Sequence, residues 1–284
     1  MNRRSGFTVV ELLVVLVIGT ILIAGAYRTL ISQERSYRVY DAAVSTQQAT
    51  RMSLQVLTAE LREISTEGAD LVYANDDSIT FRALRKLGFI CEMNKTLKQV
   101  VVLRMGQDSF AVGDSVLVYV DGDTLTGSDD SWDLAAVSGA SSGACTSVTG
   151  LAIASALLGS TQTLLKLAGA PHIDSVNEGA PVRSFQRLTF GLRQYGSTWY
   201  LARATGSDSM VPIVGPLAPP SSSGLVFTYY DTLGNVLTSL PLDSAARAAV
   251  RRVQIAVRGQ KRTNAGTIQT YVDSLVTNVF IRGG

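Results

Sequence analysis

The chain has 284 residues, with 25 Lys and Arg against 23 Asp and Glu, one His and two Cys. Its hydrophobic content of 46% and charged content of 17% exclude a disordered chain, and a net charge of +2 gives no general attraction to nucleic acid. Two Cys and one His cannot complete a four-ligand zinc site on their own. The mean hydropathy of +0.21 is high for a chain that is otherwise polar and rich in turns.

The N-terminal region accounts for that hydropathy. A short basic segment, Met1–Gly6, precedes Phe7–Tyr27, which contains a single charge, Glu11. This apolar segment supplies roughly four-fifths of the positive hydropathy total, and no other stretch is long enough to span a membrane. A bilayer needs about 20 apolar residues, so the segment spans only with Glu11 inside it, where a carboxylate costs up to about 3 kcal/mol. Glu11 is therefore expected to need a cationic partner.

Two general interpretations of this segment are possible. In a secretory signal peptide, Arg3 and Arg4 would form the basic region and Ala24–Ala26 the cleavage site. However, Glu11 interrupts the apolar core, and the helical pattern continues past the supposed site. In a plain single-span anchor, the two arginines would hold the N-terminus in the cytoplasm, but the role of Glu11 would be unexplained.

A third interpretation rests on the string Gly6-Phe7-Thr8-Val9-Val10-Glu11-Leu12-Leu13. It resembles the processing signal of type IV prepilins and type II secretion pseudopilins: a basic leader ending in Gly, then Phe, then Glu five residues into the mature chain. The resemblance implies that prepilin peptidase cleaves between Gly6 and Phe7 and N-methylates Phe7. The new amine is a cation that Glu11 can neutralise at low dielectric. In the family, this charge pair forms between neighbouring subunits.

The helix is expected to continue beyond the apolar segment. The residues after Tyr27 favour helix, and no proline occurs before Pro171. A helix over 7–65 would be about 90 Å long, and Gly68 is the expected C-cap.

One stripe of this helix is expected to be buried. It could form a coiled-coil dimer or pack on a sheet, and the weak positions Gln47 and Thr50 favour the sheet. The stripe consists of residues spaced three and four apart: Tyr40, Ala43, Gln47, Thr50, Leu54, Leu57, Leu61 and Ile64.

Beyond Gly68, short β-branched or aromatic runs predict strands. Hairpin turns are expected at Tyr195-Gly196-Ser197 and Leu233-Gly234-Asn235, and loops at 138–163 and 215–224. The predicted fold is therefore α+β: a long N-terminal helix, membrane-spanning in its first half, packed on an antiparallel β-sheet domain. The predicted strands are Ser78–Leu84, Phe89–Met93, Gln99–Arg104, Asp114–Asp121, Trp132–Val137, Phe185–Arg193, Thr198–Ala204, Leu225–Tyr230, Arg252–Arg258 and Thr270–Ile281.

A second, more diffuse resemblance points to a subgroup. The patterns Asp114–Asp123, Trp199–Arg203 and Leu225–Gly234, with a closing strand pair Arg251–Val257 and Thr270–Arg282, resemble the minor subunits that include the secretion pseudopilin J and the pilus subunit W. The chain length also fits minor subunits better than major pilins. The end of the chain, Arg282-Gly283-Gly284, departs from the subgroup.

The two cysteines, Cys91 and Cys145, fall in the part expected outside the cytoplasm, where disulfides persist. A bond between them would close a loop of about 54 residues and stabilise the fold by about 4 kcal/mol in the chain-entropy model. The alternative is two free thiols. A redox role is not expected, because no Cys-x-x-Cys motif is present.

One acidic segment raises the question of calcium. Hard oxygen ligands at this density could hold Ca²⁺, but the EF-hand spacing fails because Leu125 occupies an expected ligand position and no Glu closes the loop. A solvated acidic turn is the favoured alternative. The acidic residues are Asp121, Asp123, Asp129, Asp130 and Asp133.

Nothing else in the sequence predicts catalysis. His172 is the sole imidazole, and no nucleophile elbow or phosphate-binding loop accompanies it. We therefore expect no enzymatic activity, no catalytic residue and no cofactor. One basic cluster flanks a predicted strand and is expected to be solvated, with DNA binding as a minor alternative: Arg247, Arg251, Arg252, Arg258, Lys261 and Arg262.

Together these features predict a minor pilin or pseudopilin that helps to initiate or cap a type IV pilus or type II secretion pseudopilus. Its implied partners are prepilin peptidase, other filament subunits, the inner membrane and the assembly platform, with no nucleic acid. The alternative is a secreted or anchored β-rich binding domain or adhesin. The predicted division is leader 1–6, transmembrane helix 7–27, amphipathic continuation 28–66 and a periplasmic or extracellular β-rich domain 67–284.

Overall fold

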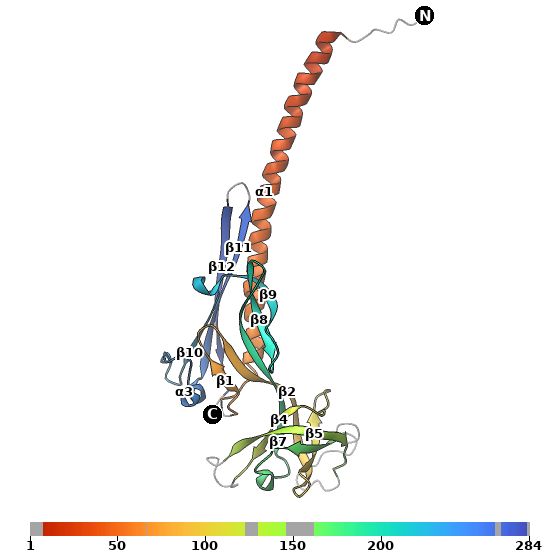
Figure 1. Ribbon diagram of the computed structural model, residues 1–284, viewed down its shortest axis with the longest axis vertical. Coiled ribbons are helices and arrows are strands. Elements are labelled where there is room, and N and C mark those ends of the chain that lie inside the picture. The colour runs from red at the N-terminus through yellow and green to blue at the C-terminus, as the bar shows by residue number, and fades with distance from the viewer. Residues whose placement is uncertain (1–7, 67, 123–129, 146–161, 265–267, 283–284) are drawn as a thin grey trace, which may run out of the picture.

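The computed structural model describes residues 8–66, 68–122, 130–145, 162–264 and 268–282. Its dominant element is helix α1, Val9–Leu61, with Thr8 as N-cap. At 1.5 Å per residue its 53 residues extend about 80 Å. Figure 1 shows the N-terminal half of α1 standing clear of a β-rich head. The predicted α+β class, with a long helix packed on an antiparallel domain, is confirmed.

Helix α1 ends earlier than the sequence predicted. Its C-cap is Arg62, in the right-handed helical conformation, and Gly68 lies beyond the helix in contact with a side chain of the head. A Cβ atom at Gly68 would lie 1.6 Å from Nη2 of Arg183. Gly68 therefore makes room for the Arg183 guanidinium and does not terminate the helix.

The buried face of α1 matches the predicted stripe only in part: Thr50, Leu57 and Leu61 are buried as predicted. Tyr40 is 74% exposed, and Gln47 is exposed as well. The reason is a close approach between α1 and a strand: a Cβ at Gly259 would lie 2.6 Å from Cγ2 of Thr46. Only small side chains fit there, so small residues precede the leucines on the buried face: Ala42, Thr46, Ala49, Thr50, Ser53, Leu57 and Leu61.

A three-stranded antiparallel sheet forms one wall of the head. Its order is β10 (Leu225–Tyr230), β11 (Arg252–Asn264) and β12 (Ile268–Phe280). Helix α1 packs along β11 and β12, and Figure 1 shows this hairpin running beside the helix. The sheet alternative for the buried stripe is thus the one observed.

The remaining strands form a nine-stranded antiparallel sheet in the order β1-β2-β3-β6-β5-β4-β7-β8-β9. Short helices η1 (Ile173–Ser175), η2 (Pro220–Ser222) and α3 (Ser244–Ala249) lie in the connections. The strands are β1 Leu71–Ala74, β2 Ile79–Asn94, β3 Gln99–Met105, β4 Ser115–Val120, β5 Ser131–Ser142, β6 Gln162–Ala168, β7 Pro181–Tyr195, β8 Thr198–Thr205 and β9 Val211–Leu217.

The long strands β2 and β7 each belong to two parts of this sheet, because they change partners along their length. The first part of β2 and the last part of β7 pair with β1 and β8, whereas their other ends pair with β3 and β4. The pairings β2–β3, β3–β6, β6–β5, β5–β4, β4–β7 and β7–β2 close into a ring, the distal barrel. One hydrophobic cluster fills this barrel, and another joins α1 to both sheets.

Several local predictions need correction. Residues 138–142, predicted to be loop, continue strand β5, and residues 215–217 of the predicted 215–224 loop belong to β9. The sequence analysis did not identify β1, β6 or β9. The hairpin at Gly196 is confirmed, since β7 and β8 pair as Tyr195 with Thr198. The Gly234 turn is present, but it leads only to an isolated bridge.

Candidate functional site at the N-terminal helix

The first turn of α1 is held by a capping box. The Thr8 backbone N–H donates to Oε2 of Glu11 at 3.0 Å, and the Glu11 N–H donates to Thr8 Oγ1 at 3.3 Å. Each residue thus satisfies a helix-end donor of the other. Glu11 has a partner within its own chain, and its carboxylate points back toward the N-terminus. Gly6 and Phe7, the predicted processing residues, lie outside the described residues.

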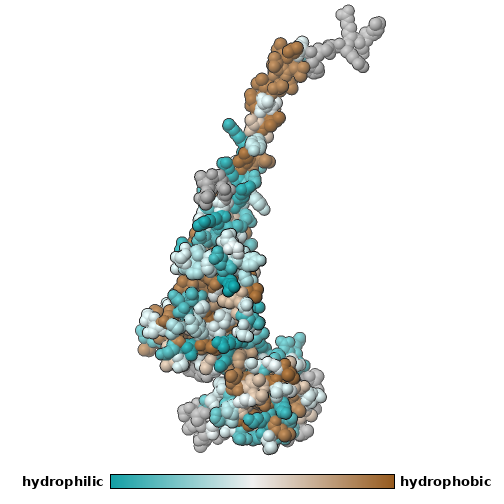
Figure 2. Space-filling model, in the orientation of Figure 1, coloured by the Kyte–Doolittle hydropathy of each residue, from teal (hydrophilic) through white to brown (hydrophobic). Residues whose placement is uncertain are grey.

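No described residue of the chain covers the apolar part of α1. Its most apolar 18-residue window has a mean hydropathy of 2.7 and is 0% buried, and by length and composition the helix can cross a membrane. Figure 2 shows this part as a continuous hydrophobic rod. A contiguous apolar surface of this size marks a membrane-embedded or protein-binding segment.

A polar stem separates this rod from the head. Residues 28–41 lie almost entirely exposed, and Arg38 pairs with Glu34 one turn earlier at 2.6 Å. The first ion pair with the head joins Asp41 to Lys261 of β11 at 2.8 Å. Those 14 residues place the end of the rod about 20 Å from the head.

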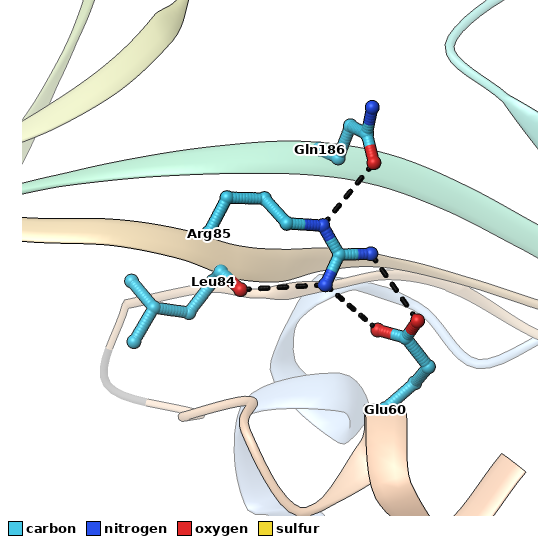
Figure 3. A network of polar contacts seen from close by, with 4 residues as sticks. All are labelled: Glu60, Leu84, Arg85 and Gln186. Atoms are coloured by element: carbon cyan, nitrogen blue, oxygen red, sulfur yellow. Dashed lines mark hydrogen bonds and ion pairs between the residues drawn. The ribbon is translucent and has the colours of Figure 1, made fainter. Parts of the chain in front are cut away.

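The lower end of α1 is fastened by Glu60 and Arg85 (Figure 3). Arg85 donates from both Nη atoms to the two carboxylate oxygens of Glu60, at 3.1 and 3.2 Å, and from Nε to Gln186 Oε1 at 3.2 Å. Arg85 lies where the β2–β7 register shifts. An extra residue in a strand redirects its side chain, and here the Arg85 side chain reaches the helix.

A buried ion pair lies just beyond the helix end. Asp70 accepts from Nη2 of Arg183 at 3.3 Å and from the Ser65 N–H at 2.8 Å, and the Arg183 guanidinium stacks over Trp132 at 4.1 Å. Burial raises the pKa of Asp70 despite the neighbouring Arg183. Burial likewise lowers the pKa of Arg183. Desolvation thus outweighs the mutual attraction, and the pair joins the end of α1 to the distal barrel.

Cys91 and Cys145 form a disulfide, with Cα atoms 5.7 Å apart. Cys91 lies in β2, and Cys145 lies three residues after the end of β5. The bond therefore ties the segment that leaves β5 back to the barrel wall.

The acidic segment does not form a metal cluster in the described part of the chain. Asp130 accepts from the Tyr119 hydroxyl, and Asp133 accepts from the His172 N–H at 2.7 Å and contacts its Nδ1 at 3.0 Å. Asp123 and Asp129 lie outside the described residues. Among those described, no three carboxylates, thiols or imidazoles gather at one point. The contact between Asp133 and His172 was not predicted, because 39 residues separate them.

The basic cluster of the sequence is dispersed in the structure. Arg247 donates to the Leu242 carbonyl, and Arg251 donates to Thr66 Oγ1. Arg252 instead stacks over the Tyr230 ring. Arg247 and Arg251 thus serve the packing of the head, whereas Arg252, Arg258 and Arg262 lie on the outer face of β11.

Comparison with known families decides what the N-terminus is. Residues 1–27 match the family model of the prokaryotic N-terminal methylation motif. The chain carries a prepilin-type N-terminus. No curated protein and no solved structure matches the chain. The motif supports a type IV pilin-like subunit that prepilin peptidase processes and that assembles with other pilins, and such proteins are structural in general. Together with the apolar helix, it supports a single-pass membrane-anchored protein.

Proposed function

We propose that this protein is a minor pilin or pseudopilin that helps to initiate or cap a type IV pilus or a type II secretion pseudopilus. Cleavage between Gly6 and Phe7 and methylation of Phe7 would produce the mature subunit. Its apolar helix would enter the filament core, and its head would lie in the periplasm or on the surface filament. No catalytic role is proposed.

The observation that carries this proposal is that the methylation motif matched at residues 1–27 includes the apolar half of α1, which is exposed among the described residues. A plain anchor would not need Glu11 inside its apolar segment, where the carboxylate is costly. In the filament, Glu11 would neutralise the methylated Phe7 amine of a neighbouring subunit, and the capping box already aims the carboxylate toward the N-terminus. A salt bridge in a dry filament interior would fix the axial register of neighbouring subunits, because an unpaired charge is strongly disfavoured there.

The test is expression of the full chain in host cells with and without prepilin peptidase. We expect the chain to lose its leader and to enter the sheared filament or pseudopilus fraction only when the peptidase is present. A chain that reaches the cell surface in equal amount without the peptidase would contradict the proposal.

The alternative is a secreted or anchored β-rich binding domain. The distal barrel favours this alternative as a second candidate, because it is a separate hydrophobic unit at the end of the molecule remote from the apolar half of α1. In that case the apolar segment would be a plain signal or anchor, and the peptidase would have no effect on the chain.

A further inference from the structure

Strand β12 is a long open edge. Its pairing with β11 has no register shift: Phe280 lies opposite Arg252 at one end, and Ile268 lies opposite Asn264 at the other. No strand follows β12 in the sheet order. The Ile281 N–H donates to the Arg251 carbonyl at 3.0 Å, so odd-numbered residues face β11. Because antiparallel strands alternate, even-numbered residues direct their N–H and C=O groups to the open side.

The other strand edges in the described part of the head are protected. Strand β1 has only four residues and a register shift, and β9 contains Pro212 and Pro216 and two register shifts. Strand β10 is covered: the Phe227 N–H donates to the Asp76 carbonyl, and the Tyr229 carbonyl accepts from Leu237. The distal barrel closes on itself. Such devices prevent edge-to-edge pairing.

Strand β12 lacks these devices. It contains no Pro, Lys or Arg, and its one charge, Asp273, is not directed outward. Asp273 Oδ2 accepts from Thr50 Oγ1 of α1 at 2.8 Å. A long, regular edge strand without charged or proline residues is a surface prepared for pairing.

Both faces beside this edge are suited to an added strand. On the outer face, Val272, Val276 and Phe280 are 39, 59 and 73% exposed. On the inner face, an open groove runs between α1 and β12, with Leu54 and Leu275 among its lining residues. Strand addition uses main-chain hydrogen bonds for affinity and pockets for alternate side chains for specificity.

The charge on the outer face of the β11–β12 hairpin indicates which charge an added strand should carry. The even-numbered residues of β11 include Arg252, Arg258 and Arg262, and the outer faces of β11 and β12 carry no Asp or Glu among the described residues. Arg258 is paired with the small Ser274. Because β12 lies between β11 and an added strand, those two backbones would be about 10 Å apart, and a carboxylate on the added strand would meet the long Arg258 side chain across Ser274, whose small side chain leaves room for it. Opposite charges that meet there attract each other.

A second copy of this chain does not fit the edge. Edge-to-edge pairing of two β12 strands by a two-fold axis would be antiparallel, and α1 runs alongside the hairpin in each copy. The two α1 helices would then point in opposite directions, so both could not enter one membrane with the same orientation.

We propose that β12 receives an extended strand from a different subunit of the same assembly, with apolar residues at alternate positions and a carboxylate that pairs with Arg258. The partner's location in the assembly rests on the proposed function, whereas the pairing chemistry rests on β12 alone. The added strand would hydrogen-bond to Val272, Ser274, Val276 and Asn278 and would place alternate side chains in the groove beside α1.

The test uses the full chain in detergent micelles and a short synthetic peptide in which valine and threonine alternate around one central glutamate. Amide hydrogen exchange should slow at Val272, Ser274 and Val276 when the peptide is added. Val276→Lys removes an apolar cross-strand contact and should weaken affinity by up to about fivefold; this is measured with a peptide in which glutamine replaces the central glutamate, so that the new lysine gains no counter-charge. The matched control is Val211→Lys, since Val211 is 60% exposed on the protected strand β9. A peptide with central lysine should bind more weakly than the glutamate peptide.

Three results would overturn the proposal: no protection at β12, equal protection at β1, β9 and β10, or unchanged affinity for Val276→Lys. Concentration-dependent protection of β12 without peptide would instead show self-pairing and would also overturn it. In host cells, Val276→Lys should reduce recovery of the chain in the filament fraction, and Val211→Lys should not. The mass of the mature N-terminus is measured on the same samples. A chain that is processed correctly but shows no strand addition would contradict this inference alone, whereas a chain that is not processed would contradict the proposed function.

Discussion

Glu11 is the residue on which the proposed assembly role depends. In the isolated chain its carboxylate caps its own helix through Thr8, so it is already aimed at the end where cleavage would create a cation. Removing the carboxylate leaves the cleavage site intact but leaves the Phe7 amine without its counter-charge in the filament core.

We therefore predict that Glu11→Ala is processed like the natural chain but is largely absent from filaments. Glu11→Gln, which keeps the shape and loses the charge, should fail in the same way. The measurement is the ratio of filament-bound to membrane-bound chain. Normal incorporation of Glu11→Gln would show that the charge is not needed.

Gly259 controls the distance between α1 and β11. A Cβ there would lie 2.6 Å from Thr46 Cγ2 and 3.0 Å from the Thr46 carbonyl oxygen. We predict that Gly259→Ala lowers the free energy of unfolding by about 1–3 kcal/mol, because a well-packed contact becomes overpacked. Adding Thr46→Ala should recover part of that loss. Denaturant unfolding of both variants in micelles checks this, and no change for Gly259→Ala would contradict the close approach.

At the scale of elements, the pair Asp70–Arg183 joins the end of α1 to the barrel. Because burial disfavours both charges, we predict that Asp70→Asn or Arg183→Met alone costs about 3–5 kcal/mol, since each leaves a buried charge unpaired. The double variant Asp70→Asn with Arg183→Met should cost less than the sum of the two single changes, because it leaves neither charge unpaired. A double-variant cost equal to the sum of the singles would exclude this coupling.

The Asp70 carboxyl also makes the free energy of unfolding depend on pH. Its pKa is raised in the folded chain above the ordinary value of 3.8, so just above pH 3.8 the folded state still holds a proton that the unfolded chain has released. The free energy of unfolding should therefore fall as pH rises through this window. Asp70→Asn should remove that contribution, and unfolding measured across the window for both chains tests it.

Elements with a strong local signal were predictable from the sequence. The unbroken helix followed from the absence of proline, and the β7–β8 hairpin followed from Gly196. The leucines of the buried face of α1 were predictable from their spacing. Its small residues were not, because they depend on Gly259, more than 200 positions away in the sequence. Closure of the distal barrel was also not predictable. It depends on β2 and β7 changing partners along their length, and no local sequence pattern indicates such a change. The exposed apolar end of α1 was predictable because Phe7–Tyr27 is a long apolar run with a single charge.

At the scale of the whole molecule, the two hydrophobic clusters lead us to expect two unfolding steps. The chain has two tryptophans, Trp132 in β5 of the barrel and Trp199 in β8, which lies outside the barrel. Trp199→Phe and Trp132→Phe should therefore report different denaturant midpoints. Reduction of Cys91–Cys145 should lower the barrel midpoint by removing about 4 kcal/mol of loop stabilisation, and it should leave the Trp199 signal nearly unchanged. A single shared midpoint before and after reduction would contradict two separate units.

The molecule as a whole is a β-rich head carried on a helix whose apolar half the chain itself leaves uncovered. The central claim is that this half is exposed for assembly after processing. The most direct measurement is the mass of the mature N-terminal peptide from host membranes. The account predicts a chain that begins with N-methylated Phe7. A chain that begins at Tyr27 would show a signal peptide, an intact Met1 would show a plain anchor, and either result would contradict the account.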